Sequence, residues 1–386
     1  MTIIADKMVC GGDCITKIDG KTVFVSGILP GEEASIKIVE SRKDFDRAEV
    51  LAITKTSPHR RQPPCPYYGS CGGCNLQIAD DDYQKELRLS ILKDCFRRGL
   101  GRTLGSDKDI TDVIDAATVL SGSSWNYRSR FQFHSDGLKK KADESIIAID
   151  SCMVATDKVN SVLEGKKLPV GSERTHVFEN LVASDDAENT EYLAKIGDAE
   201  LLFNVRGFFQ SNLEMMTRTI TLIKNELSER LEKHSCNKTT ERLLLDMYCG
   251  VGTFTRFLGP LFSKSFLVEH NAHAIGYAEK NVADIPHASY AMSGAKWVRT
   301  PEAKADYAAV VIDPPRSGME KEVAAWLCNK KTPLIISVSC DPVTHARDAA
   351  KLIQSGYRLE KLVLLDFYPQ TSHIESFAVF TSQSKR

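Results

Sequence analysis

The pattern of apolar and polar positions divides this chain into parts that differ in their expected secondary structure. Near the N-terminus, short runs rich in β-branched side chains are separated by the turn-forming pairs Asp19-Gly20 and Pro30-Gly31. The predicted strands lie at residues 21–25, 34–39 and 47–53. Because several short strands in so short a segment favour a closed sheet, we expect a small, OB-like β-barrel over residues 1–57.

The C-terminal part shows a different alternation, in which apolar strands and helical segments follow one another. A long helix is predicted over residues 215–233 and precedes the first of these strands. The predicted strands lie at residues 243–248, 266–269, 308–312, 334–338, 362–367 and 376–380. Such alternation is typical of a parallel, doubly wound sheet, so we expect a Rossmann-like α/β domain over residues 206–386.

Residues 58–205 predict a central α+β domain. Its first part, residues 58–82, is rich in proline and predicts an irregular loop, after which residues 83–99 predict a helix ending at Arg97-Arg98-Gly99. The apolar side chains of this helix share one face, which would allow the segment 83–100 to pack on the C-terminal domain. Strand-like segments follow at residues 127–134, 146–149 and 200–205, whereas the polar stretch 163–198 predicts loops.

Composition narrows the classes of protein that this chain can represent. It has 386 residues, of which 42% are hydrophobic and 26% charged, as in an ordinary globular protein. No apolar run reaches the roughly 18 residues of a transmembrane helix, and the first residues lack the features of a signal peptide. We therefore predict a cytoplasmic protein with no membrane contact. The net charge of −1 means that any nucleic-acid partner must be held by local basic patches.

A glycine turn follows the first strand of the C-terminal domain. The segment Tyr248-Cys249-Gly250-Val251-Gly252 comes directly after this strand, and Glu269 closes the next one. Glycines let the backbone approach a ligand, and an acid at the end of the second strand can accept hydrogen bonds from a ribose. The third glycine of a dinucleotide site is absent and a long helix precedes the strand. The pattern therefore favours S-adenosylmethionine over NAD.

The cysteines suggest metal binding rather than a disulfide framework, because the chain has eleven of them and no export signal. Cys65, Cys71 and Cys74 lie within ten residues of one another, with glycines between them. We expect Cys152, which follows a strand, to be the fourth ligand. The spacing fits Cys₄ zinc and a [4Fe–4S] cluster alike. No role is assigned to Cys10, Cys14, Cys95, Cys236 and Cys328, and Cys249 is interpreted as a small apolar residue of the glycine turn.

Cys340 stands where the apolar strand 334–338 ends, and chemistry in open α/β sheets gathers at such strand ends. Asp313 ends an earlier strand, so the thiol, this acid and the glycine turn are expected to face one crevice. A catalytic thiol needs help to ionise, and the amides of a helix opening after Asp341 would favour its anion. The Asp341 carboxylate itself would raise the pKa of the thiol unless it points away.

Three longer segments contain these positions. They are Asp313-Pro314-Pro315-Arg316-Ser317-Gly318, Ser337-Val338-Ser339-Cys340-Asp341-Pro342-Val343-Thr344 and Asp366-Phe367-Tyr368-Pro369-Gln370-Thr371-Ser372-His373-Ile374-Glu375. In order and spacing they resemble the signatures of the RNA 5-methyluridine methyltransferase family, which methylates C5 of uracil. The segments 20–25 and 29–32 resemble a TRAM RNA-binding barrel. The cysteine motif is similar to the [4Fe–4S] site of the branch that acts mainly on 23S ribosomal RNA.

The resemblance implies a class I, S-adenosylmethionine-dependent enzyme with an RNA partner, and it implies a role for each matching residue. Cys340 would be the nucleophile that adds to C6 of uracil, and Glu375 the base that removes the C5 proton. The cofactor would be held by Gln210, Tyr248, Gly250, Thr253, Glu269 and Asp313, with Ser293 on the adenine side. The cluster ligands would be Cys65, Cys71, Cys74 and Cys152. The family usually has asparagine where Asp341 stands.

Other functions remain open at this point. A 23S ribosomal RNA target is favoured, but a transfer RNA is also compatible with the sequence. An RNA cytosine-C5 methyltransferase would use the same thiol attack, although such enzymes usually carry a second cysteine in a Pro-Cys motif where this chain has Pro314-Pro315. An RNA-binding protein without activity, on a methyltransferase scaffold, is the alternative from another class. We expect a monomer.

Overall fold

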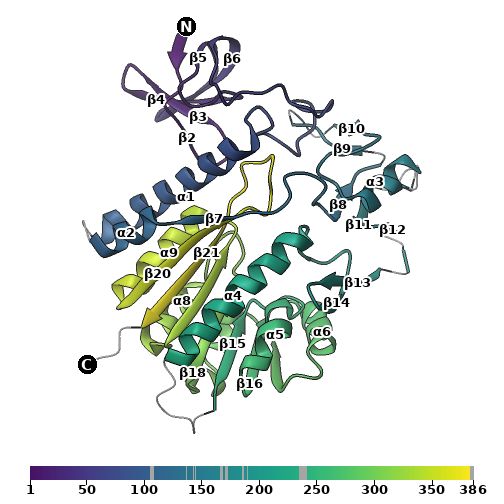
Figure 1. The fold of residues 1–386 in the computed structure, drawn as a ribbon, viewed down its shortest axis with the longest axis vertical. Coiled ribbons are helices and arrows are strands. Elements are labelled where there is room, and N and C mark those ends of the chain that lie inside the picture. Colours follow the sequence, from purple (N-terminus) through teal and green to yellow (C-terminus); the bar gives the residue numbers. More distant parts are fainter. Residues whose placement is uncertain are drawn as a thin grey trace.

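The computed structural model describes residues 1–104, 108–135, 137–141, 143, 145–165, 168–169, 173–184, 187–188, 190–233 and 241–382. It shows an N-terminal sheet, the long helix α1 beneath it, a smaller β-rich part and a large α/β part (Figure 1). None of the helices in these ranges combines the length and apolar character needed to span a membrane. Cys236, which has no assigned role, lies outside the described residues.

The N-terminal sheet has six strands in the order β1-β5-β6-β4-β3-β2. They are β1 (Thr2–Ile4), β2 (Lys7–Met8), β3 (Cys14–Ile18), β4 (Lys21–Ser26), β5 (Glu33–Ser41) and β6 (Phe45–Lys55). Val23, Val25 and Ile36 fill its core and are at most 3% exposed. Because β2 follows β1 almost directly in the chain, the two edges of the sheet lie near each other and the sheet bends toward a barrel. The three strands predicted from the sequence are confirmed.

Helix α1 (Asp81–Leu104) is longer than the sequence predicts and connects the parts of the molecule. Its apolar face, which includes Leu87 and Ile91, is buried, and the helix packs along α9 (Pro342–Gln354) of the C-terminal part. The predicted helix end at Gly99 is wrong. A Cβ on Gly99 would lie 2.8 Å from the Cβ of Ala346 in α9, so this glycine permits close packing of two helices. Helix α2 (Lys108–Asp115) then leads into β7 (Thr118–Leu120).

The central part contains three small antiparallel sheets, β9–β10, β12–β11–β8 and β13–β14. Its elements are β8 (Arg130–Phe133), β9 (Gly137–Lys139), β10 (Ile146–Ala148), α3 (Asp157–Glu164), β11 (Thr175–Phe178), β12 (Leu181–Ser184), β13 (Glu191–Ile196) and β14 (Ala199–Asn204). The prediction of loops over residues 163–198 is wrong, because β11, β12 and β13 lie there. These strands are short and β13 buries only every second side chain, which leaves few apolar positions to detect.

The C-terminal part is an eight-stranded sheet in the order β17-β16-β15-β18-β19-β21-β20-β7, flanked by helices. Its strands are β15 (Leu243–Met247), β16 (Lys264–Glu269), β17 (His287–Ala291), β18 (Tyr307–Ile312), β19 (Leu334–Ser339), β20 (Tyr357–Leu365) and β21 (Glu375–Ser382). The helices are α4 (Leu213–Lys233), α5 (Thr253–Leu258), α6 (Ala272–Asn281), α7 (Gly294–Trp297), α8 (Lys321–Lys330) and α9, with short 3₁₀ turns η1 (Gly259–Leu261) and η2 (Glu302–Lys304).

The sheet departs from the expected all-parallel arrangement in one strand. β21 runs antiparallel between β19 and β20, whereas the other neighbours in the sheet are parallel. An antiparallel strand begins at the edge where its parallel neighbours end. The first residue of β21, Glu375, therefore lies at the same edge as the last residues of β18 and β19. The edge strand β7 comes from the preceding part of the chain and pairs with β20.

Candidate active site

Four of the predicted residues lie at the carboxyl ends of neighbouring parallel strands. Tyr248 follows β15, Glu269 closes β16, Asp313 follows β18 and Cys340 follows β19. Glu375 joins them from the antiparallel β21, where Ser376 pairs with Ser339, the residue before Cys340. The topology of the sheet thus places a thiol and three acids along one edge.

A cavity of about 770 Å³ opens at this edge of the sheet. Its lining includes every residue predicted for catalysis or for the cofactor: Gln210, Tyr248, Gly250, Thr253, Glu269, Ser293, Asp313, Cys340 and Glu375. Segments that are distant in the sequence therefore contribute to one site. We call the part of the lining around the glycine turn the cofactor end and the part around Cys340 the thiol end.

The cofactor end is shaped by backbone conformations that few residues adopt. Tyr248, Gly250 and Gly252 have φ angles of +66°, +55° and +80°, so the chain turns sharply between β15 and α5. One oxygen of the Glu269 carboxylate accepts from the Gly250 amide at 3.3 Å and the other from the Asn271 amide at 2.8 Å. These bonds fix the carboxylate against the turn.

Two other acids near the turn have different environments. Asp246 is fully buried and accepts hydrogen bonds from the amide and the hydroxyl of Thr255, at 3.1 and 2.7 Å. Burial raises its pKa to about 7. Asp246 therefore ties β15 to α5 instead of facing a ligand. Asp313 lines the cavity, and burial, together with the nearby Asp246, raises its pKa to about 7 as well.

The thiol end does not activate Cys340 in the way that the sequence suggests. Burial raises the pKa of the thiol to about 11, with further contributions from Glu375 and Asp313, while Arg316 lowers it. The first amides of α9 were expected to lower the pKa of the thiol, but they have another partner. The Asp341 carboxylate accepts from the amides of Val343 and Thr344, at 3.0 and 2.8 Å, and so caps the helix itself.

The same two bonds determine whether the Asp341 carboxylate can raise the pKa of the neighbouring Cys340 thiol. Because its carboxylate is directed into the first turn of α9, it is held away from the thiol, and the acids that raise the pKa of Cys340 are Glu375 and Asp313. Burial also raises the pKa of Glu375 well above its ordinary value, with Asp313 adding to the effect and Arg316 opposing it. The thiol and both acids are thus electrostatically linked.

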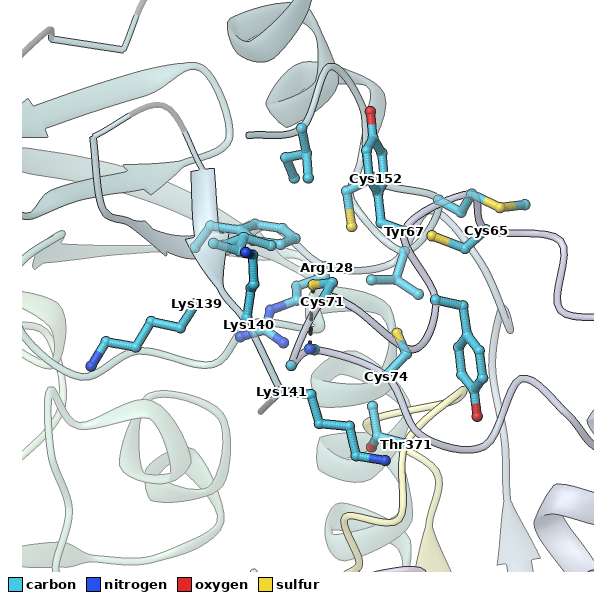
Figure 2. Close-up of a pocket in the computed structure, with 18 of the residues that line it drawn as sticks. Cys65, Tyr67, Cys71, Cys74, Arg128, Lys139, Lys140, Lys141, Cys152 and Thr371 are labelled. Carbon is cyan, nitrogen blue, oxygen red and sulfur yellow. Dashed lines mark hydrogen bonds between the residues drawn. The ribbon is translucent and has the colours of Figure 1, made fainter. Parts of the chain in front are cut away.

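The four predicted metal ligands gather at a second cavity, of about 600 Å³, in the central part of the molecule. Figure 2 shows the sulfur atoms of Cys65, Cys71, Cys74 and Cys152 arranged around one space. Burial raises the pKa of the Cys74 thiol to about 12, and the three other thiols add to this. In the part of the chain that the structure describes, no group of three or more His, Cys, Asp or Glu side chains is arranged to hold a metal ion.

Comparison with known proteins gives the site a family. The sequence signature described as tRNA (Uracil-5-)-methyltransferase matches residues 302–383, and that of the TRAM domain matches residues 6–51. An uncharacterized RNA methyltransferase of Treponema denticola is 38% identical over 407 residues, which cover 97% of each chain. This chain belongs to the RNA (uracil-5-)-methyltransferase family. It is a class I, S-adenosylmethionine-dependent enzyme with an N-terminal TRAM domain.

Other members of the RNA (uracil-5-)-methyltransferase family match along the whole chain. The 23S rRNA (uracil(1939)-C(5))-methyltransferase RlmD of Photorhabdus laumondii is 26% identical over 434 residues, covering 99% of this chain and 96% of RlmD. The crystal structure of Pyrococcus abyssi tRNA (uracil-54, C5)-methyltransferase, in complex with S-adenosyl-L-homocysteine, has a TM-score of 0.73. It covers 99% of this chain and all of that chain at 22% identity, a likeness that shows a shared fold.

Two cavity residues received no role from the sequence of this methyltransferase. Phe208 lines the cavity, yet its side chain is 73% exposed, which is unusual for a large aromatic. Arg316 also lines the cavity and lowers the pKa of both Cys340 and Glu375. Arg316 stands inside the segment 313–318 that resembles a family motif, and Phe208 lies two residues before Gln210, which was predicted to bind the cofactor. A signal was therefore present for each, but only the structure indicates what they contact.

Proposed function

We propose that this enzyme methylates C5 of a uridine in RNA, with 23S ribosomal RNA as the favoured substrate, through a covalent adduct with Cys340. The observation that carries the proposal is the single cavity that holds a thiol, a nearby acid and a glycine turn suited to a nucleoside. C5 of uracil is a poor nucleophile, and addition of a thiolate to C6 makes C5 reactive. The chemistry therefore requires a thiol and a base at one site.

The residues at the thiol end would act in sequence. The Cys340 thiolate adds to C6 of the uracil, and the electron pair of the C5–C6 double bond moves toward C5 and the C4 carbonyl. After C5 is methylated, Glu375 takes the C5 proton, the double bond re-forms and the C6–S bond breaks to release the thiolate. Arg316, which favours the ionised forms of Cys340 and Glu375, would support both steps.

The cofactor end would bind S-adenosylmethionine, which supplies the methyl group. Glu269 would accept hydrogen bonds from the ribose, and the turn around Gly250 would let the backbone approach the nucleoside. Asp313, between the two ends of the cavity, would accept a hydrogen bond either from the uracil edge or from the amino group of the cofactor. Gln210, Tyr248, Thr253 and Ser293 complete the proposed cofactor wall.

The exposed ring of Phe208 supports a role in holding the target base. A uridine in folded RNA must leave its stack to reach Cys340, at a free-energy cost of a few kcal/mol. An aromatic ring at the mouth of the cavity can stack on the flipped base and recover part of this free energy. The TRAM domain would add sequence-independent contacts to the RNA.

The nucleotide that is methylated distinguishes this proposal from its alternatives. We expect methyl transfer from labelled S-adenosylmethionine to an RNA hairpin that contains uridine but no cytidine, and none to the hairpin that contains cytidine but no uridine. Methylation of cytidine alone would contradict the proposal. Mapping 5-methyluridine in ribosomal and transfer RNA from a deletion strain would then identify the target, and loss of the modification from transfer RNA alone would exclude 23S ribosomal RNA.

We propose that Cys65, Cys71, Cys74 and Cys152 hold a [4Fe–4S] cluster. Sulfur ligands of one zinc ion, at about 2.3 Å from the metal, crowd around a single point. The four thiols line one cavity of about 600 Å³, which has room for an inorganic core larger than a single ion. This room favours the cluster over zinc.

Metal analysis tests this assignment. Protein purified without oxygen is expected to be brown and to carry about four irons per chain, because each of the four thiolates would bind one iron. Cys74→Ser should lose the colour and destabilise the central part of the molecule, whereas Cys328→Ser, a half-buried cysteine on α8, should keep both. A colourless protein with stoichiometric zinc would contradict the assignment of a [4Fe–4S] cluster and identify the site as a zinc site.

A further inference from the structure

The loop that leads into Glu375 is held by the central part of the molecule. This loop, residues 366–374, joins β20 to β21 and rises from the sheet in yellow in Figure 1. At its start, the buried Arg88 of α1 forms an ion pair of 2.6 Å with the buried Asp366 and donates to the Tyr368 carbonyl at 3.3 Å. The Tyr127 hydroxyl donates to the Pro369 carbonyl at 2.8 Å.

Gln370 is the centre of these contacts. It is fully buried and has a φ angle of +70°, which a side chain tolerates only when its surroundings fix it. Its side-chain oxygen accepts from Arg61 and Gln84, both at 2.9 Å, and its amide nitrogen donates to Asp81 at 3.0 Å. Its backbone amide donates to Gln84 at 2.9 Å. The middle of the loop is thus bound on every side by residues outside the catalytic sheet.

The remaining contacts come from the loop that carries Cys65, Cys71 and Cys74, here called the cysteine loop. The amides of Asn75 and Leu76, directly after Cys74, donate to the Gln370 carbonyl at 3.2 and 3.0 Å. The Asn75 side chain forms two bonds with Ser372: it accepts from the Ser372 amide at 2.8 Å and donates to the Ser372 hydroxyl at 2.9 Å. Thr371 lies in the chain between Gln370 and Ser372 and forms part of the wall of the cysteine-lined cavity (Figure 2).

We propose that Asn75 and Gln370 are positioning residues through which the cysteine loop sets the position of Glu375. Only Ser372, His373 and Ile374 lie between Thr371 on the cavity wall and Glu375 on the substrate cavity. A group bound by Cys74 fixes the start of the Asn75 segment, and the bonds to Gln370 and Ser372 transmit that position to the base. The inference rests on the proposed role of Glu375 in releasing the adduct.

This coupling makes a specific claim about the reaction. Addition of Cys340 to C6 and methylation of C5 use the thiol that follows β19 and the glycine turn after β15, and neither belongs to the 366–374 loop. Loss of the C5 proton uses Glu375, and proton transfer depends strongly on the distance and direction of the base. A loosened loop should therefore slow release of the adduct while its formation continues.

The test uses Asn75→Ala in the full-length protein with its iron content measured. The variant should bind S-adenosylmethionine as the wild type does, form the covalent RNA adduct at a similar rate and release it on the order of 10²-fold more slowly, the scale expected when a catalytic group is displaced by about 1 Å. Asn75→Asp keeps the acceptor for the Ser372 amide and should recover part of the release rate. Gln132→Ala is the matched control, because this exposed amide lines the same cavity but bonds to His134.

Removal of iron by a chelator tests the same coupling without a mutation. Iron-depleted wild-type protein should accumulate adduct as Asn75→Ala does, and the Asn75→Ala protein should stall even with full iron. If the Asn75→Ala variant does not fold, Ser372→Ala removes one bond of the same pair from the other side. Normal release by Asn75→Ala, or by the iron-depleted protein, would overturn the coupling. Failure of the wild type to form any uridine adduct would instead overturn the proposed function.

Discussion

Cys340→Ala should abolish methyl transfer and leave the binding of S-adenosylmethionine nearly unchanged. The thiol is the only atom of the side chain that can add to C6 of uracil, whereas the cofactor end of the cavity is built from the turns after β15 and β16. Loss of the covalent nucleophile of a serine protease reduces kcat by about 10⁶-fold, and a large loss is expected here for the same reason. The measurement is transfer of a labelled methyl group to RNA, combined with calorimetric titration of the cofactor.

Cys328→Ala is the matched control for this variant, because Cys328 lies on α8 and bonds to a backbone carbonyl of α9 at 3.5 Å. It should retain wild-type turnover. Turnover by Cys340→Ala above a trace level would refute its assignment as the nucleophile. Wild-type protein should also be trapped on RNA that contains 5-fluorouridine, because fluorine at C5 cannot leave as a proton does. A protein that only binds RNA would form no such adduct.

Glu375→Gln should stall the reaction after the methyl group has been transferred. Glutamine keeps the size of the side chain but cannot accept the C5 proton, so the C6–S bond should break only slowly. General-base catalysis contributes about 10² to 10⁴-fold in typical enzymes, and release should slow by that order. Denaturing gels with labelled RNA should show a retarded covalent band for Glu375→Gln and little for the wild type.

Glu360→Gln provides the control for the loss of a carboxylate from the same pair of strands. Glu360 lies on β20, where it accepts from the Thr381 hydroxyl at 2.7 Å. This variant should release product normally. If Glu375→Gln turned over at the wild-type rate with no retarded band, another group would be the base. Asp313 would then be the strongest candidate, because it lines the same cavity and its pKa is raised to about 7.

The sequence predicts most of the catalytic edge because parallel strands have a simple relation between order and position. Cys340, Asp313 and Glu269 could be placed at strand ends from apolar runs alone. Glu375 could not, because its place depends on β21 running antiparallel, and a short apolar run does not reveal strand direction. The resemblance to a family motif supplied the residue, and the topology supplies the physical reason for its position.

Each prediction that failed has an identifiable physical cause. A glycine after two arginines predicts a helix end, but at Gly99 the neighbouring α9 requires the missing Cβ and the helix continues. Asp341 before a proline is a typical helix cap, and that local signal outweighs the expectation that the first amides of α9 would serve the thiol. The bridge from Asn75 to Ser372 joins segments so distant in the chain that no local pattern could predict it.

β7 pairs with β20, and α1 packs on α9. Both contacts affect how the chain folds while the ribosome is still synthesising it. The six strands of the N-terminal sheet all lie within residues 2–55, so they emerge together before the rest of the chain. The apolar face of α1 and the β7 strand emerge soon afterwards, but their partners are among the last residues to be synthesised. Until then the nascent chain exposes an apolar helix and an unpaired strand, both of which promote aggregation. For the same reason, a fragment limited to residues 206–386 would leave the edge of β20 bare, and a useful truncation must retain residues 81–120.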